Sequence, residues 1–327
     1  MEETIGDIGE LALIERIKPF CAANAIGDDA ALMSIRAGFQ LVVTTDVLVE
    51  GVHFSDRTTP PYAVGWRSVA ANLSDLAAMG ADPIGITVGL GLPKQTPWPW
   101  VEAFYCGMAD CLKSYGSEIY GGDLCRAEQR TVSITALGEV EPQRAVRRNV
   151  ATAGMTVVVT GPHGISRAGL AVLLGEIEQT PASDAWIRAH QMPIPRFDVV
   201  AQLKEIIGNK NSAIAGMDSS DGLANALLQL SHSSQVGIEV FQPSIPLPTG
   251  LSEAVGKETA LNWALYGGED FELVLCLPPE IAERLVKAGM AIAIGQTTQH
   301  NAGKTHLFKT KTSPQGTLIQ HKSFQHF

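Results

Sequence analysis

Apolar residues in the first half of the chain follow two periods in alternation, and these predict helices and strands in turn. Helical spacing of apolar residues runs through residues 8–20, 62–79 and 98–115. Gly80 and Gly116 are placed to end the second and third of these helices. Runs rich in β-branched residues predict a strand or hairpin at 41–52, a short strand before Gly121, and strands at 84–92 and 131–140. This alternation predicts an α/β or α+β fold.

The second half of the chain repeats the alternation after a basic segment at 144–149. The predicted strands are 157–161, 213–217, 271–277 and 291–295. The predicted helices begin at Ser166 and span 196–207, 222–232 and 279–288, and the tail beyond 299 is polar. We therefore expect two domains, residues 1–148 and residues 149–327.

Composition and charge limit the class of protein. The 327 residues carry a formal net charge of −10, and 45% of them are hydrophobic. The hydrophobic share is ordinary for a globular protein, and the acidic balance argues against nucleic-acid binding. We find no secretory signal and no membrane span, and the five cysteines form no Cys-x-x-Cys pair. A cytoplasmic protein with reduced thiols, bound to neither nucleic acid nor membrane, is the expectation.

Short acidic turns rich in small residues recur along the whole chain. Six of them are Gly27–Ala30, Thr44–Asp46, Leu73–Asp82, Gly121–Asp123, Asp218–Gly222 and Gly267–Asp270. Any one of them has an ordinary structural explanation, because Asp caps helices and forms turns. Asp221 could be only a helix cap, and Asp82 only a turn former. As a set they indicate carboxylates that converge on a hard cation such as Mg²⁺, which commonly accompanies nucleotide phosphates.

A basic phosphate-binding loop is missing from the sequence. The segment Gly303-Lys304-Thr305 lacks the earlier glycine of a P-loop and lies in the polar tail, so we reject it. The turn Gly161–Gly164 either presents amides to an anion or is a plain strand-to-helix turn. Arg147 and Arg148 either pair with a phosphate or are exposed linker residues. His53 is equally open to a structural and a functional role.

Several stretches, in this order, resemble the thiamine-monophosphate kinase family, which belongs to the superfamily of aminoimidazole ribonucleotide synthetase and selenophosphate synthetase. They extend over nearly the whole chain, and the one from Asn72 to Pro83 is highly specific. The stretches are Ile26–Ala30, Thr44–Asp46, Gly51–Phe54, Asn72–Pro83, Gly121–Asp123, Asp218–Leu223 and Gly267–Leu273.

The resemblance implies a two-domain synthetase-like fold and a homodimer. Residues 1–148 would bind ATP and Mg²⁺ and would join the mixed sheet of a second copy in a dimeric β-barrel. Residues 149–327 would form a C-terminal α/β domain that completes the nucleotide and substrate site. The implied activity is ATP-dependent phosphorylation of thiamine monophosphate to thiamine diphosphate with several Mg²⁺ ions, the last step of thiamine diphosphate biosynthesis.

The resemblance also assigns site residues by motif. The implied metal ligands are Asp29, Thr44, Thr45, Asp46, Asp75, Asp123, Asp218 and Asp221. The implied ATP contacts are Gly122, Asp123, Ser220 and Arg148, with Arg147 as the alternative arginine. The implied contacts to thiamine monophosphate are His53, Glu269 and Phe324.

The expected mechanism is direct in-line transfer without a catalytic general base, because the attacking phosphate oxygen is already ionised. Three alternatives remain: a sibling synthetase, a metal-dependent phosphatase and a non-catalytic nucleotide-binding scaffold. A selenophosphate synthetase would carry its reactive Cys in a glycine-rich loop, which Cys21 lacks. A nucleophilic-aspartate phosphatase would need an Asp-x-Asp pair, but Asp46 is followed by Val47 and Leu48.

Overall fold

The structure is a computed structural model that describes residues 3–23, 30–208, 210, 212–310 and 313–318. The chain divides into two compact units. Unit 1 comprises Met1–Leu76 and Ala81–Pro142, and unit 2 comprises Ala77–Gly80 and Gln143–Phe327. Within the described ranges, no helix is both long and apolar enough to cross a membrane. The functional division predicted at residue 148 stays a prediction.

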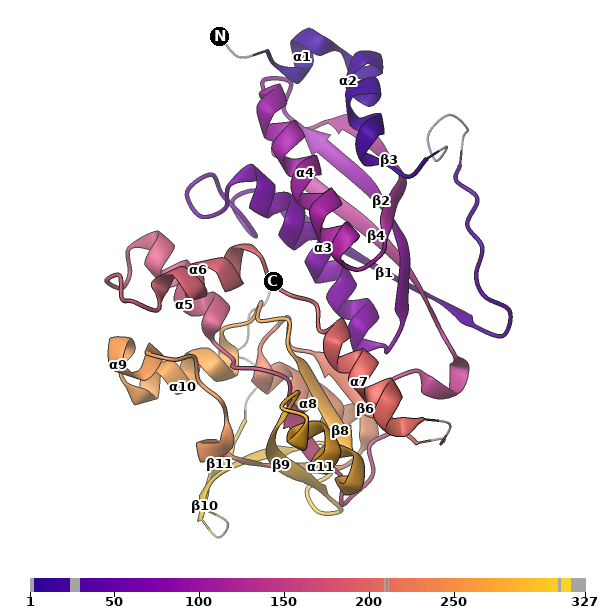
Figure 1. Cartoon of the computed structure of the whole chain (residues 1–327). Coiled ribbons are helices and arrows are strands. Elements are labelled where there is room, and N and C mark those ends of the chain that lie inside the picture. The colour runs from indigo at the N-terminus through magenta and orange to yellow at the C-terminus, as the bar shows by residue number, and fades with distance from the viewer. Residues whose placement is uncertain (1–2, 24–29, 209, 211, 311–312, 319–327) are drawn as a thin grey trace. The chain divides into compact units, whose positions relative to one another are not determined.

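Unit 1 is built on one four-stranded sheet whose strand order is β1-β4-β2-β3 (Figure 1). The strands are β1 (Gln40–Val49), β2 (Asp82–Leu92), β3 (Glu118–Arg126) and β4 (Thr131–Val140). The helices and 3-10 turns that begin in this part of the chain are α1 (Ile5–Ile8), α2 (Glu10–Ile17), η1 (Lys18–Phe20), α3 (Pro61–Ala78), α4 (Trp98–Ser114) and η2 (Pro142–Arg144). The β2–β3 pair is parallel and the β1–β4 and β2–β4 pairs are antiparallel, so the sheet is mixed.

The two faces of this sheet differ. Helices α3 and α4 lie against one face (Figure 1), and their inward side chains, such as Leu73 and Phe104, are fully buried. Side chains alternate between the faces of a strand, so every second residue of β1 points to the other face. There Leu41, Val43 and Val47 are 49%, 56% and 48% exposed. An apolar surface therefore runs along β1 on the face opposite the helices.

Unit 2 contains a seven-stranded sheet with the order β11-β10-β7-β9-β5-β8-β6. The strands are β5 (Thr156–Val159), β6 (Ala215–Asp218), β7 (Gly237–Phe241), β8 (Leu273–Leu277), β9 (Ile292–Thr298), β10 (Thr305–Thr310) and β11 (Ser313–Thr317). The helices are α5 (Ile165–Leu174), α6 (Ser183–Gln191), α7 (Phe197–Ile207), α8 (Leu223–Ser234), α9 (Leu251–Val255), α10 (Lys257–Tyr266) and α11 (Pro279–Lys287), with a 3-10 turn η3 (Gln242–Ser244). The β7–β10 pair is parallel and the other pairs are antiparallel.

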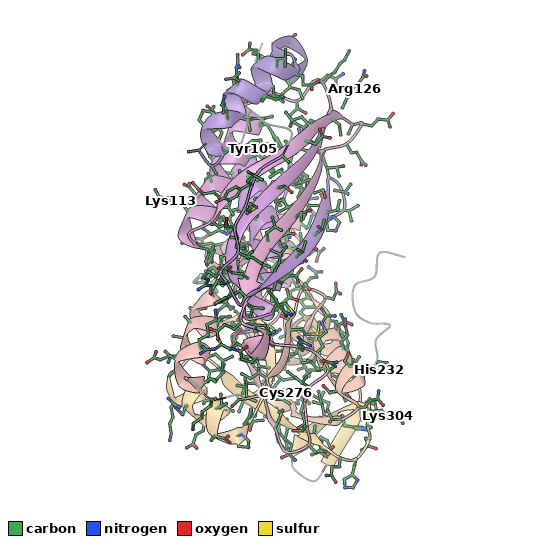
Figure 2. All side chains as sticks on the ribbon, turned by 90° about the vertical axis from the view of Figure 1, so that its right-hand side faces the viewer. Tyr105, Lys113, Arg126, His232, Cys276 and Lys304 are labelled. Carbon is green, nitrogen blue, oxygen red and sulfur yellow. The ribbon has the colours of Figure 1, made fainter. Side chains whose placement is uncertain are left out.

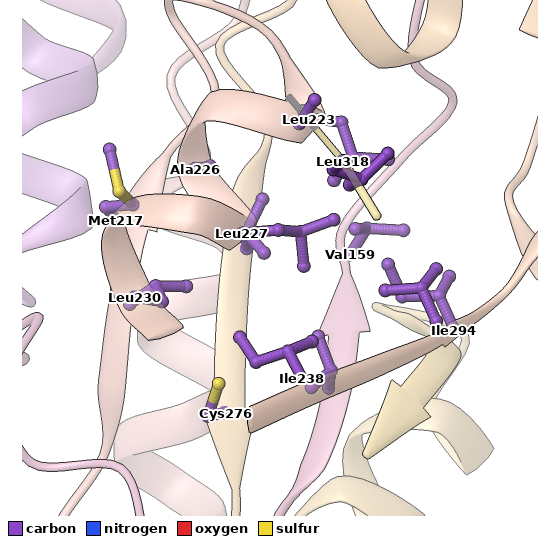
Figure 3. Close-up of a cluster of buried hydrophobic side chains, with 14 of the residues drawn as sticks. Val159, Met217, Leu223, Ala226, Leu227, Leu230, Ile238, Cys276, Ile294 and Leu318 are labelled. Carbon is purple, nitrogen blue, oxygen red and sulfur yellow. The ribbon is translucent and has the colours of Figure 1, made fainter. Parts of the chain in front are cut away.

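Both faces of this sheet are buried. Val157 and Val159 belong to a core cluster with α8 and α10, and Figure 3 shows Val159 of this cluster with Leu223 and Leu227 of α8. Val158 between them belongs to a second cluster with α7 and α11. Cys276 on strand β8 is fully buried, whereas His232 is exposed (Figure 2). A strand buried on both faces has no polar alternation, which is why β8 is a continuous apolar run.

The mixed α/β architecture in two units confirms the predicted fold class. The sheet of unit 1 is open within one chain, so its closure into a barrel would need a second copy. The predicted helix at 8–20 is instead α1, α2 and η1, because Gly9 has φ 77° and interrupts the helical backbone. The elements that the sequence pattern did not predict are α6, β7, α9, α10, β10 and β11.

Candidate functional site

In unit 1, predicted site residues of β1 meet the polar side of α3. The backbone N–H of Asp46 donates to Asn72 Oδ1 at 3.1 Å. The Thr44 hydroxyl donates to Asp75 Oδ2. Asn72 and Asp75 are three residues apart, so they share one face of the helix, as predicted. Strand and helix together therefore present the oxygen atoms of Thr44, Asp46 and Asp75 on the helix-covered side of the sheet.

Two other predicted ligands lie on the opposite face. Thr45 Oγ1 is 2.9 Å from Thr135 Oγ1, and the Thr45 side chain is exposed. Asp123 is aligned with Gly89 of β2, which is aligned with Ser133 of β4, so register places the exposed Asp123 on this same face. The sheet thus separates Thr45 and Asp123 from Thr44, Asp46 and Asp75 within unit 1. Any metal contact of Thr45 on the helix side would have to use its main chain.

Gly122 and His53 each have a defined local structure. A Cβ atom on Gly122 would lie 2.0 Å from the carbonyl oxygen of Val88, so only glycine permits this close approach of β3 to β2. The backbone N–H of Val49 donates to His53 Nδ1 at 3.1 Å. Because Nδ1 accepts, the proton of the neutral ring lies on Nε2. His53 is therefore prepared to donate a hydrogen bond through Nε2.

In unit 2, the acidic turn that follows β6 is tightly held. Asp218 is 3% exposed, and the Ser220 hydroxyl donates to its Oδ1 at 3.2 Å. Asp221 Oδ2 accepts from Asn225 Nδ2 at 3.2 Å. The N-cap of α8 is Gly222, and no side chain caps this helix. The reading of Asp221 as only a helix cap is therefore wrong.

The second acidic turn of unit 2 lies against the first. The backbone N–H of Glu269 donates to the carbonyl oxygen of Ser220 at 2.6 Å. Glu269 and Phe271 have φ values of 57° and 52°, a left-handed conformation that costs a non-glycine residue about 1–2 kcal/mol. Such strain persists only where the surroundings fix the backbone. This contact brings two predicted site residues, Ser220 and Glu269, together.

The turn between β5 and α5 presents amides to an anion, and the anion belongs to the protein itself. The N–H groups of Gly164 and Ser166 donate to Asp270 Oδ2 and Oδ1 at 2.6 and 2.9 Å. Burial raises the pKa of Asp270 to about 7, although these two amide hydrogen bonds lower it. From the sequence, this turn was expected either to bind an external anion or to be a plain turn. In the structure, the two amide N–H groups donate to the carboxylate of Asp270 instead.

His163 joins the same turn to the first acidic turn. Its Nδ1 is 3.1 Å from the carbonyl oxygen of Gly161, and its Nε2 is 3.0 Å from Ser219 Oγ. A carbonyl only accepts, so Nδ1 carries the proton and Nε2 accepts from the Ser219 hydroxyl. The ring is fully buried, and burial lowers the pKa of His163 to about 4. His163 is therefore neutral near pH 7.

A partly buried ion pair supports the strand that follows Glu269. Arg196 donates to Asp198 through Nε and Nη2 at 3.0 and 2.9 Å, and its Nη1 pairs with Glu272. Burial raises the pKa of Glu272, and Arg196 opposes that shift. Sequence reasoning assigned no role to Arg196, Glu272, His163 or Asp270. The available signal was the acidic pair Asp270 and Glu272 at the entry to an apolar strand, where charges need partners.

The remaining predicted site residues are placed as follows. Arg148 Nη1 donates to Gln229 Oε1 at 2.7 Å at an exposed position, and the main chain of Arg147 pairs with Ala215. Asp29 and Phe324 lie outside the described residues. Over the part of the chain that the structure describes, no group of three or more His, Cys, Asp and Glu side chains forms a ready metal cage. Each unit therefore offers its own small set of oxygen donors.

Comparisons with known proteins agree with this architecture. The family described as AIR synthase related protein matches with its N-terminal domain over residues 27–140 and its C-terminal domain over residues 152–307. A thiamine-monophosphate kinase from Synechococcus elongatus is 46% identical over 330 aligned positions, which cover 100% of this chain and 98% of that protein.

Two solved structures are similar over nearly the whole chain. AaThiL complexed with AMPPCP and TMP has 35% identity and a TM-score of 0.77 and covers 98% of both chains. The thiamine-monophosphate kinase from Stenotrophomonas maltophilia K279a has 31% identity and a TM-score of 0.80 and covers 91% of this chain and 96% of that one. The chain therefore belongs to the thiamine-monophosphate kinase family of AIR synthase related proteins.

Proposed function

We propose that this protein transfers the γ-phosphoryl group of ATP to thiamine monophosphate and so forms thiamine diphosphate and ADP. The observation that carries the proposal is the similarity, over 98% of the chain, to AaThiL complexed with AMPPCP and TMP. The acidic turns of both units are consistent with it, because phosphoryl transfer between two anions needs charge neutralisation. Residence in the cytoplasm stays a prediction from the sequence.

The donor chemistry of the site fits Mg²⁺. Hydroxyl and carboxylate oxygens are the ligands that Mg²⁺ prefers, and the chain offers Thr44, Asp46 and Asp75 in unit 1 and Asp218 and Asp221 in unit 2. Bound Mg²⁺ would neutralise charge on the phosphate oxygens. Thr45 and Asp123 are proposed for the same role from the other face of the sheet.

The other site residues would bind and orient the two substrates. Arg148, Gly122 and Ser220 are proposed to contact ATP, and His53 and Glu269 to contact thiamine monophosphate. A phosphate oxygen of thiamine monophosphate forms the new bond to the γ-phosphorus as the bond to the bridging oxygen of ADP breaks. That oxygen is already ionised, so no proton has to be removed by a base. His53, which carries its proton on Nε2, is suited to donate a hydrogen bond to the substrate.

One incubation tests the proposal. The protein with ATP, Mg²⁺ and thiamine monophosphate is expected to yield ADP and thiamine diphosphate in equal amounts, with thiamine in place of its monophosphate as the control. Release of inorganic phosphate without thiamine diphosphate would favour a phosphatase or a sibling synthetase. Binding of ATP without any turnover would favour a scaffold.

The partner of unit 1 is proposed to be a second copy of this chain. The exposed apolar residues Leu41, Val43 and Val47 line the open face of the sheet at its β1 edge. An apolar surface of this kind marks an interaction site, and a mixed sheet that is open in one chain can complete a barrel with another. In this proposal residues 1–148 carry dimerisation and part of the ATP site, and residues 149–327 complete the site.

Molar mass in solution tests the dimer. Wild-type protein is expected to elute with twice the chain mass of 34.8 kDa in size-exclusion chromatography with light scattering. Val43→Glu places a charge on the open face and is expected to give a monomer. Val286→Glu, at an exposed apolar position of α11 in unit 2, is the matched control and should leave the dimer intact. A monomeric wild type would overturn the proposal.

A further inference from the structure

We infer that Asp270 is a positioning residue, an internal anion that holds the start of α5 and thereby fixes Glu269 for its contact with the substrate. This inference rests on the proposed function, in which Glu269 contacts thiamine monophosphate. Asp270 itself touches neither substrate in this proposal. Its carboxylate is buried and is shared between two backbone amides, Gly164 N–H and Ser166 N–H, at 2.6 and 2.9 Å.

The two amides mark the first turn of a helix. The first N–H groups of an α-helix have no partner within the helix, and a negative charge there is favourable. In α5 the N-cap is Gly164, which has no side chain to cap the helix. The missing cap is supplied by Asp270, 106 residues away from Gly164 in sequence. Helices are usually capped by a residue next to them in sequence. Such a local cap would stabilise α5 without connecting it to the turn that carries Glu269.

The distant cap has a geometric consequence for Glu269. A chain of contacts leads from Asp270 through Ser166 to His190 and back to Glu269. Ser166 donates through its N–H to Asp270, and its hydroxyl lies 3.0 Å from His190 Nδ1. That nitrogen is 3.9 Å from Glu269 Oε2, which is longer than a hydrogen bond and is an ion pair when His190 is protonated. Asp270 and Glu269 are covalent neighbours, so the contacts close a ring. Glu269 is therefore linked to Asp270 in two ways: directly through the main chain, and through Ser166 and His190.

The backbone of the turn needs such a support. Glu269 and Phe271, on either side of Asp270, have φ values of 57° and 52°. This left-handed conformation is unfavourable for residues with a Cβ atom. The hydrogen bonds of Asp270 hold the residue between them and so maintain the conformation on both sides. Without that carboxylate, the turn is expected to relax and to move the Glu269 side chain.

The test separates positioning from folding. Asp270→Asn keeps the shape of the side chain but replaces one acceptor oxygen by a donor, so one of the two amides loses its partner. We expect the KM for thiamine monophosphate to rise about tenfold, because small displacements of a binding group are costly. The KM for ATP should change less than about twofold, because the Ser220 side chain proposed to contact ATP is held on its own turn by Asp218.

A double-mutant cycle shows whether Asp270 acts through Glu269. Glu269→Gln is expected to raise the same KM, and adding Asp270→Asn to it should then have little further effect, because residues in one network are not additive. Additive effects of the two substitutions would overturn the inference. Ser166→Ala, which breaks the ring without touching Asp270, should raise the KM by about fivefold, the equivalent of one ordinary hydrogen bond.

A destabilised control excludes a merely structural effect. Leu285→Ala truncates a fully buried side chain of α11, in a core cluster that contains none of the proposed site residues, and should lower thermal stability while leaving the KM per active site unchanged. If it raises this KM as much as Asp270→Asn does, the inference fails.

Hydrogen exchange provides a readout that does not need activity. Asp270→Asn is expected to speed the exchange of the Gly164, Ser166 and Glu269 amides together. Faster exchange at Gly164 and Ser166 with an unchanged Glu269 would contradict the inference even if the protein proves to be an active kinase. If wild type forms no thiamine diphosphate, the proposed function fails, and the exchange result alone still decides whether Asp270 holds Glu269.

Discussion

The two units hold their predicted site residues in different ways. In unit 1, Asp46 and Asp75 are placed by a regular strand and a regular helix, and hydrogen bonds of Asp46 with Asn72 and of Asp75 with Thr44 join the two elements. In unit 2, Ser220 and Glu269 lie on irregular turns that are held by contacts distant in sequence, such as those of His163 and Asp270. Regular elements position a residue through local geometry, whereas irregular turns need buried polar partners. Substitutions next to the site residues are thus expected to affect the site less in unit 1 than in unit 2.

The strongest way to test this comparison is to remove a carboxylate from the regular site. Asp75→Asn keeps an acceptor for Thr44 but removes the charge, so the fold should survive while activity falls. We expect kcat to drop about 10²–10³-fold, the size seen when one electrostatic stabiliser of a transition state is lost. Formation of thiamine diphosphate is measured at saturating Mg²⁺. Glu102→Gln, at an exposed carboxylate of α4, is the control, and near-normal turnover of Asp75→Asn would refute the metal role.

The buried groups of unit 2 predict a compensated pH dependence of stability. The pKa of His163 is lowered from 6.5 to about 4, so unfolding takes up protons in this window and stability rises with pH there. The pKa of Asp270 is raised from 3.8 to about 7, so folding takes up protons and stability falls as the pH rises. Each contribution is about 3–4 kcal/mol at most and of opposite sign, which should leave the wild type nearly flat.

Single substitutions of His163 and Asp270 should reveal the two opposite contributions to the pH dependence of stability. His163→Gln is expected to make the free energy of unfolding decrease from about pH 4 to about pH 7, because only the Asp270 contribution remains. Asp270→Asn should give the reverse slope over the lower part of the range. Urea unfolding across this range measures both slopes. Parallel profiles for the wild type and the two variants would show that neither group titrates as the structure indicates.

The smallest expected effect compares two adjacent threonines on opposite faces of β1. Thr44→Val removes the hydroxyl that donates to Asp75, a charge-assisted hydrogen bond worth about 1.5 kcal/mol, so activity should fall roughly tenfold. Thr45→Val removes only the contact with Thr135 and should change activity less than about twofold. Both variants are assayed for thiamine diphosphate at limiting Mg²⁺. An equal loss in the two variants would mean that the faces of the sheet do not divide the site.

The regular part of the protein was readable from the sequence. Helical spacing and the Gly80 stop predicted α3 nearly to its ends, and the spacing of Asn72 and Asp75 predicted that they share a face. The alternation of side chains along a strand also implies that Thr45 lies on the opposite face of β1 from Thr44 and Asp46, although the motif grouped the three residues together. Short-range periodicity is sufficient for such features because it follows directly from backbone geometry.

The irregular part could not be read in the same way. Nothing in the local sequence of Gly161–Gly164 indicates that its amides belong to Asp270, because the partner is more than a hundred residues away in sequence. The strands β10 and β11 were missed since their sequence is polar and they depend on pairing with β7 and with each other. Contacts of long sequence separation are fixed by the assembled fold, so only the structure reveals them.

The last turn of α3 has a consequence for how this protein can be made. Unit 2 is discontinuous, because Ala77–Gly80 belong to it although they precede most of unit 1 in the chain. Ala77, Ala78 and Val146 pack in the same core cluster as Val199 and Leu203. A gene fragment that starts at residue 149 would encode a core with these side chains missing. Expression of the second half alone, or its fusion to another protein at that point, is therefore expected to give aggregated material. The core of unit 2 is complete only when Ala77–Gly80 and the second half of the chain have both left the ribosome.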